Sequence, residues 1–557
     1  MKIFFFSFLL IFSVTSHAQL HPAPNAVLNY TQVLFTIPNT VAANNYVITI
    51  TNSEAKTFTY KTNTLACLVS NNLHFGHAYT WQYKGYYNKK LVYTSSLIPF
   101  AIGTHNSINP ASFTYKITVH NVAAASQPHT IFLCDAQSVA INYKGKPVWY
   151  MPPMPIAYPP QDSNRRSLRI SYTGSFTYLN VVNCYERDLA GNLLWQAPNN
   201  GLVSGDTVEY YHHDFQKLAN GNYMASSYKT LTEANPFNPK NNWTARYNTL
   251  IEYNNQKNIV WQWNEKDYVD STLIIENGDA TTQEYSGTHL NGFDIDTAKR
   301  NIITSYRNTS RLLNITYPSG QVNYELGRQN TNKVKVSSQY YTLNAQHGPT
   351  FLPNGNVLVY DNNYNAKAKI VTNKNTNPII RVLQPPTNTA PDIQLWQYEC
   401  KSDTFAYGQQ GKEGYTMLMP NGNILVSQGG THRMFELSWN KKIVWECFSY
   451  QYSTNQKKWL PQTNYRNYAA TSLYPLAFSL QCRYNNARTV IGCRLNNEGT
   501  NKQTFIIETY QNKQLIASHT HTLNGGTSVA MPVATATKLT YLVYPQYALE
   551  LAQQIIY

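Results

Sequence analysis

The sequence predicts an all-β fold built around a six-bladed β-propeller, and two observations lead to this prediction. Tyrosine and tryptophan are frequent, at 44 and 10 residues, while only 13% of residues are charged. Aromatic side chains fit a pleated strand surface, so this composition favours strands over helices. In addition, a short apolar strand that ends in an aromatic residue recurs six times between residues 126 and 455.

Each copy of this repeat is a turn, a few apolar residues and a Trp or Tyr. The six copies end at Trp149, Trp195, Trp261, Tyr324, Trp396 and Trp445. Asn-Gly turns interleave with them, at Gly221, Gly355 and Gly422, and each precedes an apolar strand. Asn-Gly between apolar runs is a strong hairpin signal, because type I′ turns need positive φ at both central residues. A hairpin closed by an aromatic strand is typical of a propeller blade; unrelated hairpins in sandwiches are the alternative.

Alternating strands flank the repeats on both sides. Apolar and polar residues alternate from Tyr46 to Ile50 and from Phe113 to Val119, which predicts an N-terminal β-sandwich over residues 19–125. The same alternation from Thr504 to Glu508 predicts a C-terminal all-β module over residues 456–557. The propeller is therefore expected over residues 126–455.

The first 18 residues predict export from the cell. Lys2 precedes an apolar run from Phe4 to Val14, and Ser16-His17-Ala18 offers a small-x-small cleavage site. This is the pattern of a secretory signal peptide, too short to span a bilayer stably. A buried N-terminal strand is the alternative. No later stretch approaches the roughly 20 apolar residues that a membrane helix needs, so we expect a secreted or periplasmic protein without a membrane span.

The net charge of +15 is carried by scattered residues. No basic run or stripe of the kind found in nucleic-acid-binding proteins occurs, so nucleic acid is not an expected partner. A basic surface also attracts small anions, which mildly favours an anionic substrate.

Seven cysteines without any CxxC pair argue against a zinc ribbon or a dense disulfide framework. Cys482 and Cys493 flank an expected hairpin around Asn485-Asn486. In an oxidising compartment they would pair, and two buried free thiols are the equal alternative.

Three histidines stand apart because each lies at the edge of a strand-turn element. His213 and His347 each lie eight residues before a turn glycine, Gly221 and Gly355, and so hold equivalent places in two repeats. Equivalent places in different blades face one channel, where we also expect His289 and Arg307. Imidazole acts as a nucleophile or proton shuttle near neutral pH, and a guanidinium fork matches a tetrahedral oxyanion. The alternative is that each histidine only caps a turn.

The ordered motifs resemble the bacterial arylsulfate sulfotransferases. The resemblance covers about residues 126–450 and rests on His212-His213-Asp214-Phe215, Thr288-His289-Leu290-Asn291, Ser305-Tyr306-Arg307, Gln346-His347 with its Asn-Gly turn, and Gly414-Tyr415-Thr416 with the strand from Arg433 to Glu436. It implies a six-bladed propeller with an N-terminal β-sandwich. It also implies transfer of a sulfuryl group from an aryl sulfate to a phenol through a sulfohistidine, with no nucleotide donor, metal or other cofactor.

The resemblance also implies roles for individual residues. His347 matches the nucleophile, while His213, His289 and Arg307 match residues around the sulfate. His289 is the expected base for the acceptor phenol. His212, Tyr306 and Arg433 are expected to contact the substrate, and either His212 or His213 faces the site.

Two departures from the family pattern stand next to these residues. Tyr306 stands where a small residue is commoner in the family, and Gly348 follows His347 where Asp is often found. The partners implied are small aryl sulfates and phenols, and a homodimer is among the expected assemblies because relatives include dimers.

Two other functions stay open at this point. A non-catalytic secreted propeller that binds glycans or a protein would keep the hairpins and need no histidine set. A metal site at His519 and His521, two residues apart on one strand face, is the third reading. Such a pair on an exposed strand is more often plain surface. The P-loop pattern that cradles nucleotide phosphates does not occur.

Overall fold

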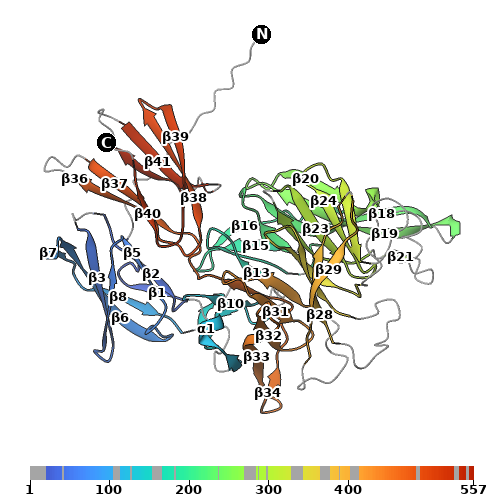
Figure 1. The fold of residues 1–557 in the computed structure, drawn as a ribbon, viewed down its shortest axis with the longest axis horizontal. Coiled ribbons are helices and arrows are strands. Elements are labelled where there is room, and N and C mark those ends of the chain that lie inside the picture. The colour runs from blue at the N-terminus through green and yellow to red at the C-terminus, as the bar shows by residue number, and fades with distance from the viewer. Residues whose placement is uncertain are drawn as a thin grey trace, which may run out of the picture. The chain divides into compact units, whose positions relative to one another are not determined.

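A computed structural model gives the structure of the chain (Figure 1). It describes residues 20–39, 43–104, 113–125, 128–152, 166–180, 183–235, 238–268, 284–285, 288–296, 299–327, 343–363, 377–387, 389–401, 413–484, 490–531, 539–546, 548 and 551–556. The predicted signal peptide lies outside these residues. The chain divides into two compact units, residues 104–473 and residues 1–103 with 474–557. The domain boundaries after residues 125 and 455 stay predictions.

The described residues of the 104–473 unit form six antiparallel sheets. In four of them, four strands follow in chain order: β13 (Arg166–Ile170), β14 (Phe176–Leu179), β15 (Cys184–Arg187) and β16 (Leu193–Gln196); β17 (Phe215–Lys217), β18 (Tyr223–Asn235), β19 (Asn238–Tyr253) and β20 (Ile259–Asn264); β22 (Leu290–Asp296), β23 (Asn301–Tyr306), β24 (Arg311–Thr316) and β25 (Val322–Gly327); and β26 (His347–Phe351), β27 (Val357–Asp361), β28 (Ile379–Gln384) and β29 (Ile393–Glu399). The short strand β21 (Glu284–Tyr285) pairs with β19, and the 3₁₀ helix η3 (Glu265–Asp267) follows β20.

The remaining two sheets of this unit join its beginning to its end. One contains β30 (Tyr415–Leu418), β31 (Ile424–Gln428), β32 (Arg433–Leu437), β33 (Ile443–Ser453) and β34 (Lys458–Pro461), and its β33 also pairs with β9 (Phe113–His120). The helix α1 (Val122–Ala125) follows β9. The other sheet contains β10 (Ile131–Cys134), β11 (Val139–Ile141) and β12 (Pro147–Tyr150), and takes its first strand, β35 (Asn467–Ala470), from the far end of the unit. In Figure 1 these two sheets lie side by side.

The six aromatic residues of the sequence repeat occupy one structural place. Each lies on the fourth strand, directly opposite a residue of the third strand: Trp149 opposite Ala140, Trp195 opposite Glu186, Trp261 opposite Glu252, Tyr324 opposite Asn314, Trp396 opposite Val382 and Trp445 opposite Glu436. The six aromatic residues therefore share one strand register although their spacing in the sequence is irregular.

Consecutive sheets pack through these aromatic residues. Trp149 stacks on Phe176 of the next sheet with 3.8 Å between ring centroids, and Trp195 stacks on Tyr223 at 3.9 Å. The sixth sheet packs on the first in the same way, with Trp445 on Phe132 at 4.2 Å. Buried aliphatic clusters join the intervening pairs of sheets.

Several of these tryptophans also donate a hydrogen bond to an outer turn of the following sheet. Trp149 Nε1 donates to the Leu189 carbonyl (3.0 Å), and Trp445 Nε1 donates to the Tyr143 carbonyl (2.8 Å). The second bond joins the sixth sheet to the first, although about 300 residues separate its partners. The indole N–H of Trp195 is buried without a hydrogen-bond partner among the described residues.

The unit of residues 1–103 and 474–557 consists of four further sheets among its described residues. Its N-terminal part contains β1 (Ala26–Leu28), β2 (Val33–Thr36), β3 (Asn45–Asn52), β4 (Thr57–Thr62), β5 (Ala66–Val69), β6 (His77–Tyr87), β7 (Lys90–Thr94) and β8 (Ile98–Ile102). Its C-terminal part contains β36 (Phe478–Tyr484), β37 (Val490–Asn497), β38 (Gln503–Gln511), β39 (Gln514–Leu523), β40 (Ser528–Ala530), β41 (Leu539–Pro545) and β42 (Gln553–Ile556). Phe35 and Trp81 pack edge to face in its core.

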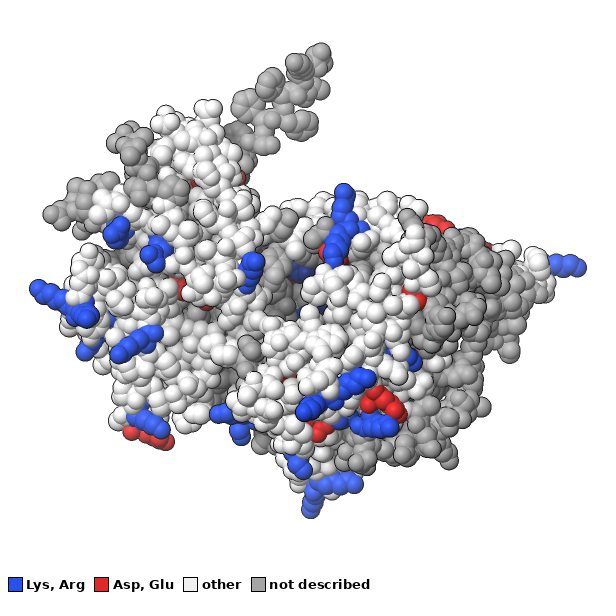
Figure 2. Space-filling model, in the orientation of Figure 1, with Lys and Arg blue, Asp and Glu red and all other residues white. Residues whose placement is uncertain are grey.

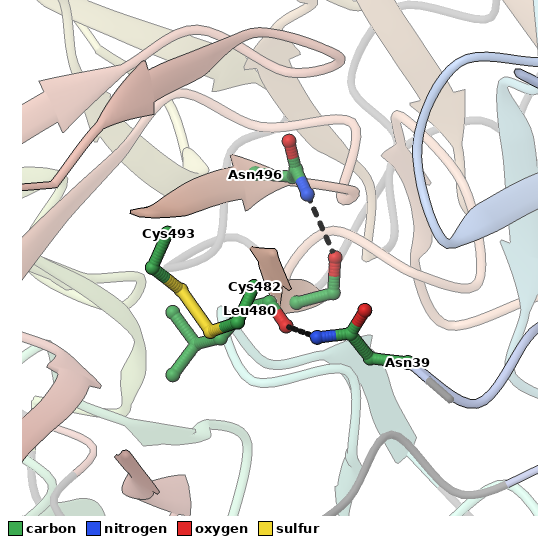
Figure 3. The surroundings of a disulfide bond; sticks show 6 residues. Asn39, Leu480, Cys482, Cys493 and Asn496 are labelled. Atoms are coloured by element: carbon green, nitrogen blue, oxygen red, sulfur yellow. Dashed lines mark hydrogen bonds between the residues drawn. A yellow bond between two sulfur atoms is a disulfide. The ribbon is translucent and has the colours of Figure 1, made fainter. Parts of the chain in front are cut away.

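Cys482 and Cys493 form a disulfide across β36 and β37, where the two residues lie directly opposite each other (Figure 3). Of the two alternatives for this pair, the structure therefore has the bridged one. Asn39 donates to the Leu480 carbonyl (3.2 Å), and Asn496 donates to Ser479 (3.1 Å), so hydrogen bonds flank the bridge on both sides.

Basic side chains lie scattered over the face of the molecule that Figure 2 shows, and acidic ones are fewer there. This agrees with the dispersed charges of the sequence. Among the described residues, no helix is long and apolar enough to cross a membrane.

We predict that Trp445→Phe destabilises the protein more than Trp195→Phe, by about 1–3 kcal/mol in the free energy of unfolding, because only the first variant leaves a buried carbonyl without its donor. Both indoles are buried and stacked, so the loss of ring area is matched. Urea denaturation followed by circular dichroism measures the difference. Equal losses in the two variants would contradict a role for the Trp445–Tyr143 bond.

Candidate active site

Three predicted histidines lie at the starts of first strands in three sheets. His213 precedes β17, His289 directly precedes β22, and His347 begins β26. His213 and His289 have positive φ values of 59° and 65°. Non-glycine residues seldom adopt this conformation, and they concentrate at functional sites, where the surrounding structure holds the strain. The structure thus brings the three histidines together at one edge of adjacent sheets.

A row of hydrogen bonds determines which ring nitrogen carries the proton in His212, His213 and His289. His212 Nε2 donates to the Ser227 carbonyl (3.1 Å), which leaves His212 Nδ1 to accept from His213 Nδ1 (2.8 Å). His213 Nε2 then accepts from His289 Nε2 (3.1 Å). In neutral imidazole one nitrogen donates and the other accepts, so the Ser227 carbonyl fixes the tautomers along the row. His213 meets His289, and His212 lies behind it against the ring of Tyr228.

Burial keeps these imidazoles neutral. It lowers the pKa of His212 to about 3, and burial together with the charge of Arg307 lowers the pKa of His289 to about 4. The pKa values of His213 and His347 lie well below the ordinary value, first because of burial and then because of neighbouring cationic or titratable groups, including Arg466. Neutral nitrogens with available lone pairs are what nucleophilic attack requires.

His347 faces a buried tyrosine. Its Nε2 lies 3.2 Å from the Tyr465 hydroxyl, and the ring of Tyr465 also approaches His213, at 6.2 Å between centroids. Arg166 and Arg466 each lie 5.2 Å from the centroid of the Tyr465 ring. Burial raises the pKa of Tyr465, so its hydroxyl stays protonated and can donate.

A buried ion pair lies beneath the histidines. Asp214 accepts from Arg466 Nη1 (2.7 Å) and from Arg169 Nη2 (2.7 Å), and its own exposed fraction is 1%. The second terminal nitrogen of Arg466 donates to the Asn291 carbonyl (2.5 Å). Asp214 also accepts from the backbone N–H of Phe293 (3.2 Å). One carboxylate thus joins residues of three sheets to the segment before β35.

Asp135 holds the backbone of Tyr465 and Arg466 in place, while Asp214 binds the Arg466 side chain. Its carboxylate accepts the backbone N–H groups of Tyr465 (3.0 Å) and Arg466 (2.9 Å). Burial raises the pKa of Asp135 to about 7, although these backbone donors act in the other sense. Asp135 follows β10, so the first sheet and its added strand are anchored at the same point.

Two glycines create the space for this arrangement. A Cβ at Gly292 would lie 2.9 Å from Arg466 Nη2. Gly348 has φ +51°, and a Cβ there would lie 2.5 Å from the ring of Tyr415. A glycine after His347 therefore fits both the positive φ and the close approach of Tyr415.

Arg307 adjoins the histidines. Its backbone N–H donates to the His289 carbonyl (2.9 Å), and its charge contributes to the lowered pKa values of His289 and His347. Tyr306 is the last residue of β23, and Arg307 lies in the turn that follows. The Tyr306 side chain is buried among Leu290, Phe293 and their neighbours.

Arg433 is held elsewhere in its sheet. It pairs with Glu446 (2.6 Å), donates to the Lys401 carbonyl (3.2 Å) and lies over the ring of Phe435. Among the described residues, none of these contacts reaches the three histidines. A substrate-binding role for Tyr306 or Arg433 stays a prediction that this geometry does not support.

The sequence reasoning missed Tyr465, Arg466 and Asp135. Tyr465 and Arg466 lie beyond the predicted end of the repeats at residue 455, and no turn or histidine marks them. The sequence around Tyr465, Arg466 and Tyr468 looks like that of an ordinary strand. One signal could have pointed to it: the first repeat has only three strands near residue 130, so its sheet needs a fourth strand from elsewhere in the chain.

The metal alternative finds little support. His519 and His521 lie on β39, an edge strand. In the part of the chain that the structure describes, no group of three or more His, Cys, Asp or Glu side chains is placed to hold a metal ion.

Buried neutral imidazoles, a protonated phenol and several guanidinium groups thus meet at one place. The Arylsulfotransferase (ASST) family model matches residues 113–468, well over half of the chain. The chain therefore belongs to the arylsulfotransferase family, which supports a sulfotransferase activity on small aryl molecules in general. The match includes Tyr465 and Arg466.

Other comparisons add little. A search of curated proteins found no match. Among solved structures, a protein of unknown function from Bacteroides caccae is 13% identical and has a TM-score of 0.37, covering 62% of this chain and 99% of that one. A streptogramin B lyase structure is also similar: it is 10% identical and has a TM-score of 0.33, covering 61% of this chain and 88% of that one. The β-propeller domain of Cps50 (Swd1) from Myceliophteria thermophila is 9% identical and has a TM-score of 0.30, covering 51% of this chain and 86% of that one. TM-scores this low carry no argument about function.

We predict that Asp214→Asn destabilises the protein by about 3–5 kcal/mol, because it leaves the buried Arg169 and Arg466 without a counter-charge. Asp296→Asn is the matched control, since its pair with Lys299 lies at the surface and should cost less than about 1 kcal/mol. Thermal and urea unfolding measure both. A small loss for Asp214→Asn would mean that the buried pair does not stabilise the site.

Proposed function

We propose that this protein transfers a sulfuryl group from an aryl sulfate to a phenolic acceptor in a ping-pong reaction through a sulfohistidine at His347. The family supports the general activity. The observation that carries the finer proposal is the surroundings of His347 Nε2: a buried, neutral nitrogen beside a protonated phenol, with Arg307 and Arg466 near enough to lower the pKa of its ring.

In the first half-reaction, His347 Nε2 forms a bond to sulfur while the bond from sulfur to the aryl oxygen breaks, and the electron pair leaves with the phenolate. Sulfuryl transfer resembles phosphoryl transfer in its loose transition state, so positioning and electrostatics dominate. Arg307 is suited to hold the peripheral oxygens. His213 and His289 adjoin it, with their N–H groups engaged in the row of hydrogen bonds. The Tyr465 hydroxyl is suited to donate to the leaving oxygen.

In the second half-reaction, the acceptor oxygen forms a bond to sulfur, the N–S bond breaks, and its electron pair returns to Nε2. The acceptor phenol loses its proton to His289, whose Nδ1 is left unprotonated by the bond from its Nε2 to His213. No step needs a nucleotide, a metal or another cofactor.

We also infer that the six sheets of residues 104–473 form a closed six-bladed propeller. The packing of Trp445 on Phe132 and the pairing of β35 with β10 support closure between the last and first sheets. The channel mouth of such a propeller would hold the histidines.

Export is part of the proposal, as a secreted or periplasmic location. The signal-peptide pattern of residues 1–18 and the Cys482–Cys493 disulfide both favour an oxidising compartment. Homodimer formation stays a prediction. A glycan- or protein-binding propeller is the second candidate, but such a binder has no need of neutral, buried histidines fixed in one tautomer.

The covalent intermediate gives the sharpest test. Wild-type protein incubated with p-nitrophenyl sulfate alone should gain the mass of one SO₃ group on the peptide that contains His347, and His347→Asn should gain none, because Asn has no nucleophilic nitrogen. With phenol added and no nucleotide or metal, only the wild type should release p-nitrophenol repeatedly. Intact-mass and peptide mass spectrometry read the adduct, and circular dichroism confirms that the variant is folded.

An adduct on His213 or His289 would show that the nucleophile is wrong. Absence of any transfer by folded protein would favour the binding alternative. Activity lost with a chelator and restored only by metal would contradict the metal-free reaction.

We predict that kcat/KM for the acceptor phenol stays nearly constant from neutral pH down to about pH 5 and falls only near pH 4. In a ping-pong reaction this profile reports the enzyme form that meets the acceptor, and the pKa of its base, His289, is lowered from 6.5 to about 4. An acid limb centred near pH 6.5 would contradict the neutral, buried state of the site.

The lowered pKa of His289 also makes the stability of the fold depend on pH. Below pH 6.5 histidines in the unfolded chain bind protons, whereas the buried histidines of the folded protein do not, so their contribution to stability falls as pH drops from 6.5 toward 4. Circular dichroism at each pH separates lost folding from lost catalysis.

A further inference from the structure

In two sheets a buried glutamate ties the Asn-Gly turn to the next sheet. Glu436 accepts from both turn asparagines, Asn421 and Asn423 (2.6 Å each), and from the Tyr143 hydroxyl of the following sheet (2.8 Å). Glu252 repeats the arrangement with Asn220, Asn222 and Tyr317, at 3.3, 2.7 and 2.6 Å. In both cases the glutamate is the residue opposite the repeat tryptophan.

The sheet of β26–β29 has the same turn without this carboxylate. Asn354 and Asn356 keep the turn, but Val382 occupies the place of the glutamate, opposite Trp396. In each of the other two pairs of sheets, the second residue of a turn in the following sheet is a tyrosine, Tyr143 or Tyr317. Here the corresponding turn residue is Trp439. The glutamate that accepts from the asparagines and the tyrosine that donates to this glutamate are thus replaced by valine and tryptophan.

A cleft opens at this place. Its volume is about 460 Å³, within the roughly 300–1,000 Å³ typical of small-molecule sites. Trp396 and Trp439 meet edge to face with 5.4 Å between centroids, and Trp439 remains 41% exposed. Their indole N–H groups donate to the Trp439 and Gly422 carbonyls, so the ring faces present no unsatisfied polar group.

The cleft is separate from the histidine site. Leu352, one of its lining residues, follows the last residue of β26, whereas His347 is the first residue of that strand. At about 3.3 Å per strand residue, the two places lie roughly 16 Å apart along the chain. The cleft therefore needs its own explanation.

Two cations flank the apolar lining. Lys441 Nζ lies 5.8 Å from the Trp396 ring centroid. Lys299 Nζ donates to the carbonyl of the lining residue Pro353 (3.0 Å) and also pairs with Asp296 (3.4 Å), whereas Lys441 has no carboxylate partner among the described residues. Among the described residues that line the cleft, none is acidic. Apolar, aromatic walls with positive charge at the rim are complementary to an apolar ring that carries a negative group.

We propose that this cleft binds a small molecule with a planar aromatic ring and an anionic substituent, its ring against Trp396 and Trp439 and its charge toward Lys441 and Lys299. The site does not depend on sulfuryl transfer. Aromatic sulfates, sulfonates and carboxylates share this chemistry, and comparing probes of each kind distinguishes them.

The test is ¹⁹F NMR of the full chain labelled with 5-fluorotryptophan, with 2-naphthalenesulfonate as the probe. The chain has 10 tryptophans, and Trp396→Phe and Trp439→Phe assign the two resonances of interest. We expect these two to shift in a saturable manner. The sulfonate has no transferable sulfuryl group, so binding is measured without turnover and its result is independent of catalysis.

Three variants sharpen the test. Val382→Glu should abolish the shifts, because it supplies the carboxylate that Asn354 and Asn356 lack and places a negative charge in the cleft, whereas Val382→Ile should preserve binding. Lys441→Gln, at an exposed residue, should weaken the sulfonate about threefold and leave 2-naphthalenemethanol unaffected, as expected for one exposed charge. Sulfuryl transfer should be unchanged in all three.

Several results would overturn the proposal. One is the absence of shifts at Trp396 and Trp439. Another is equal binding of the neutral alcohol and the sulfonate, or binding of maltose in their place. Self-association that depends on Trp439 in sedimentation experiments would identify the cleft as an interface between copies instead.

Discussion

The buried pairing of Asp214 with Arg466 and Arg169 is the interaction on which the site depends. Its carboxylate is 1% exposed, and two guanidinium groups reach it from different sheets. Removing charges from water is costly unless every partner is in place, so this pair persists only while the sheets keep their positions. In return it fixes the backbone after His213 and, through Arg466, the carbonyl of Asn291. Two segments that carry catalytic candidates are thus joined to one carboxylate.

Burial is the main reason why His347 and His213 stay neutral. The guanidinium of Arg466 acts in the same direction, because a nearby positive charge opposes protonation of an imidazole. The row from Ser227 through His212 and His213 to His289 then assigns one proton to each ring. This arrangement is coherent because every member is neutral. Protonation of His212 or His213 would place two donors face to face and break the row, whereas His289 can gain a proton at Nδ1 and still donate from Nε2 to His213.

The repeated part of the fold could be predicted from the sequence, but the strand that completes the first sheet could not. Trp149, Trp195, Trp261, Tyr324, Trp396 and Trp445 were recognisable from local turn and strand signals, and they share one register. Those signals act over a few residues. The pairing of β35 with β10 joins residues more than 300 positions apart, and no local pattern encodes it. Tyr465 and Arg466 were missed for that reason, since they enter the site only because β35 completes the first sheet.

The candidate site was likewise predictable where local sequence patterns mark it, and not where distant segments meet. His213 and His347 shared a place relative to their turns, and the structure brings them together with His289. The burial of Tyr306 in a hydrophobic cluster was not predictable from its motif, because that cluster combines residues of two sheets. Gly348 has a positive φ of +51° and lies against Tyr415, and neither feature can be read from the sequence around His347.

A repeated architecture exposes where one copy departs from the others. The third-strand place opposite the aromatic residue holds Glu in three sheets, Asn in one, and Ala or Val in the other two. Two of those glutamates gather the turn asparagines and a tyrosine, which closes the junction between sheets. Where Val382 replaces the glutamate, no carboxylate satisfies the turn, and tryptophan replaces tyrosine in the next sheet. Losing the glutamate alone would leave a tyrosine hydroxyl without its acceptor. The paired change to Val and Trp removes both polar groups at once, and so converts a structural contact into an apolar cleft without an unsatisfied hydroxyl.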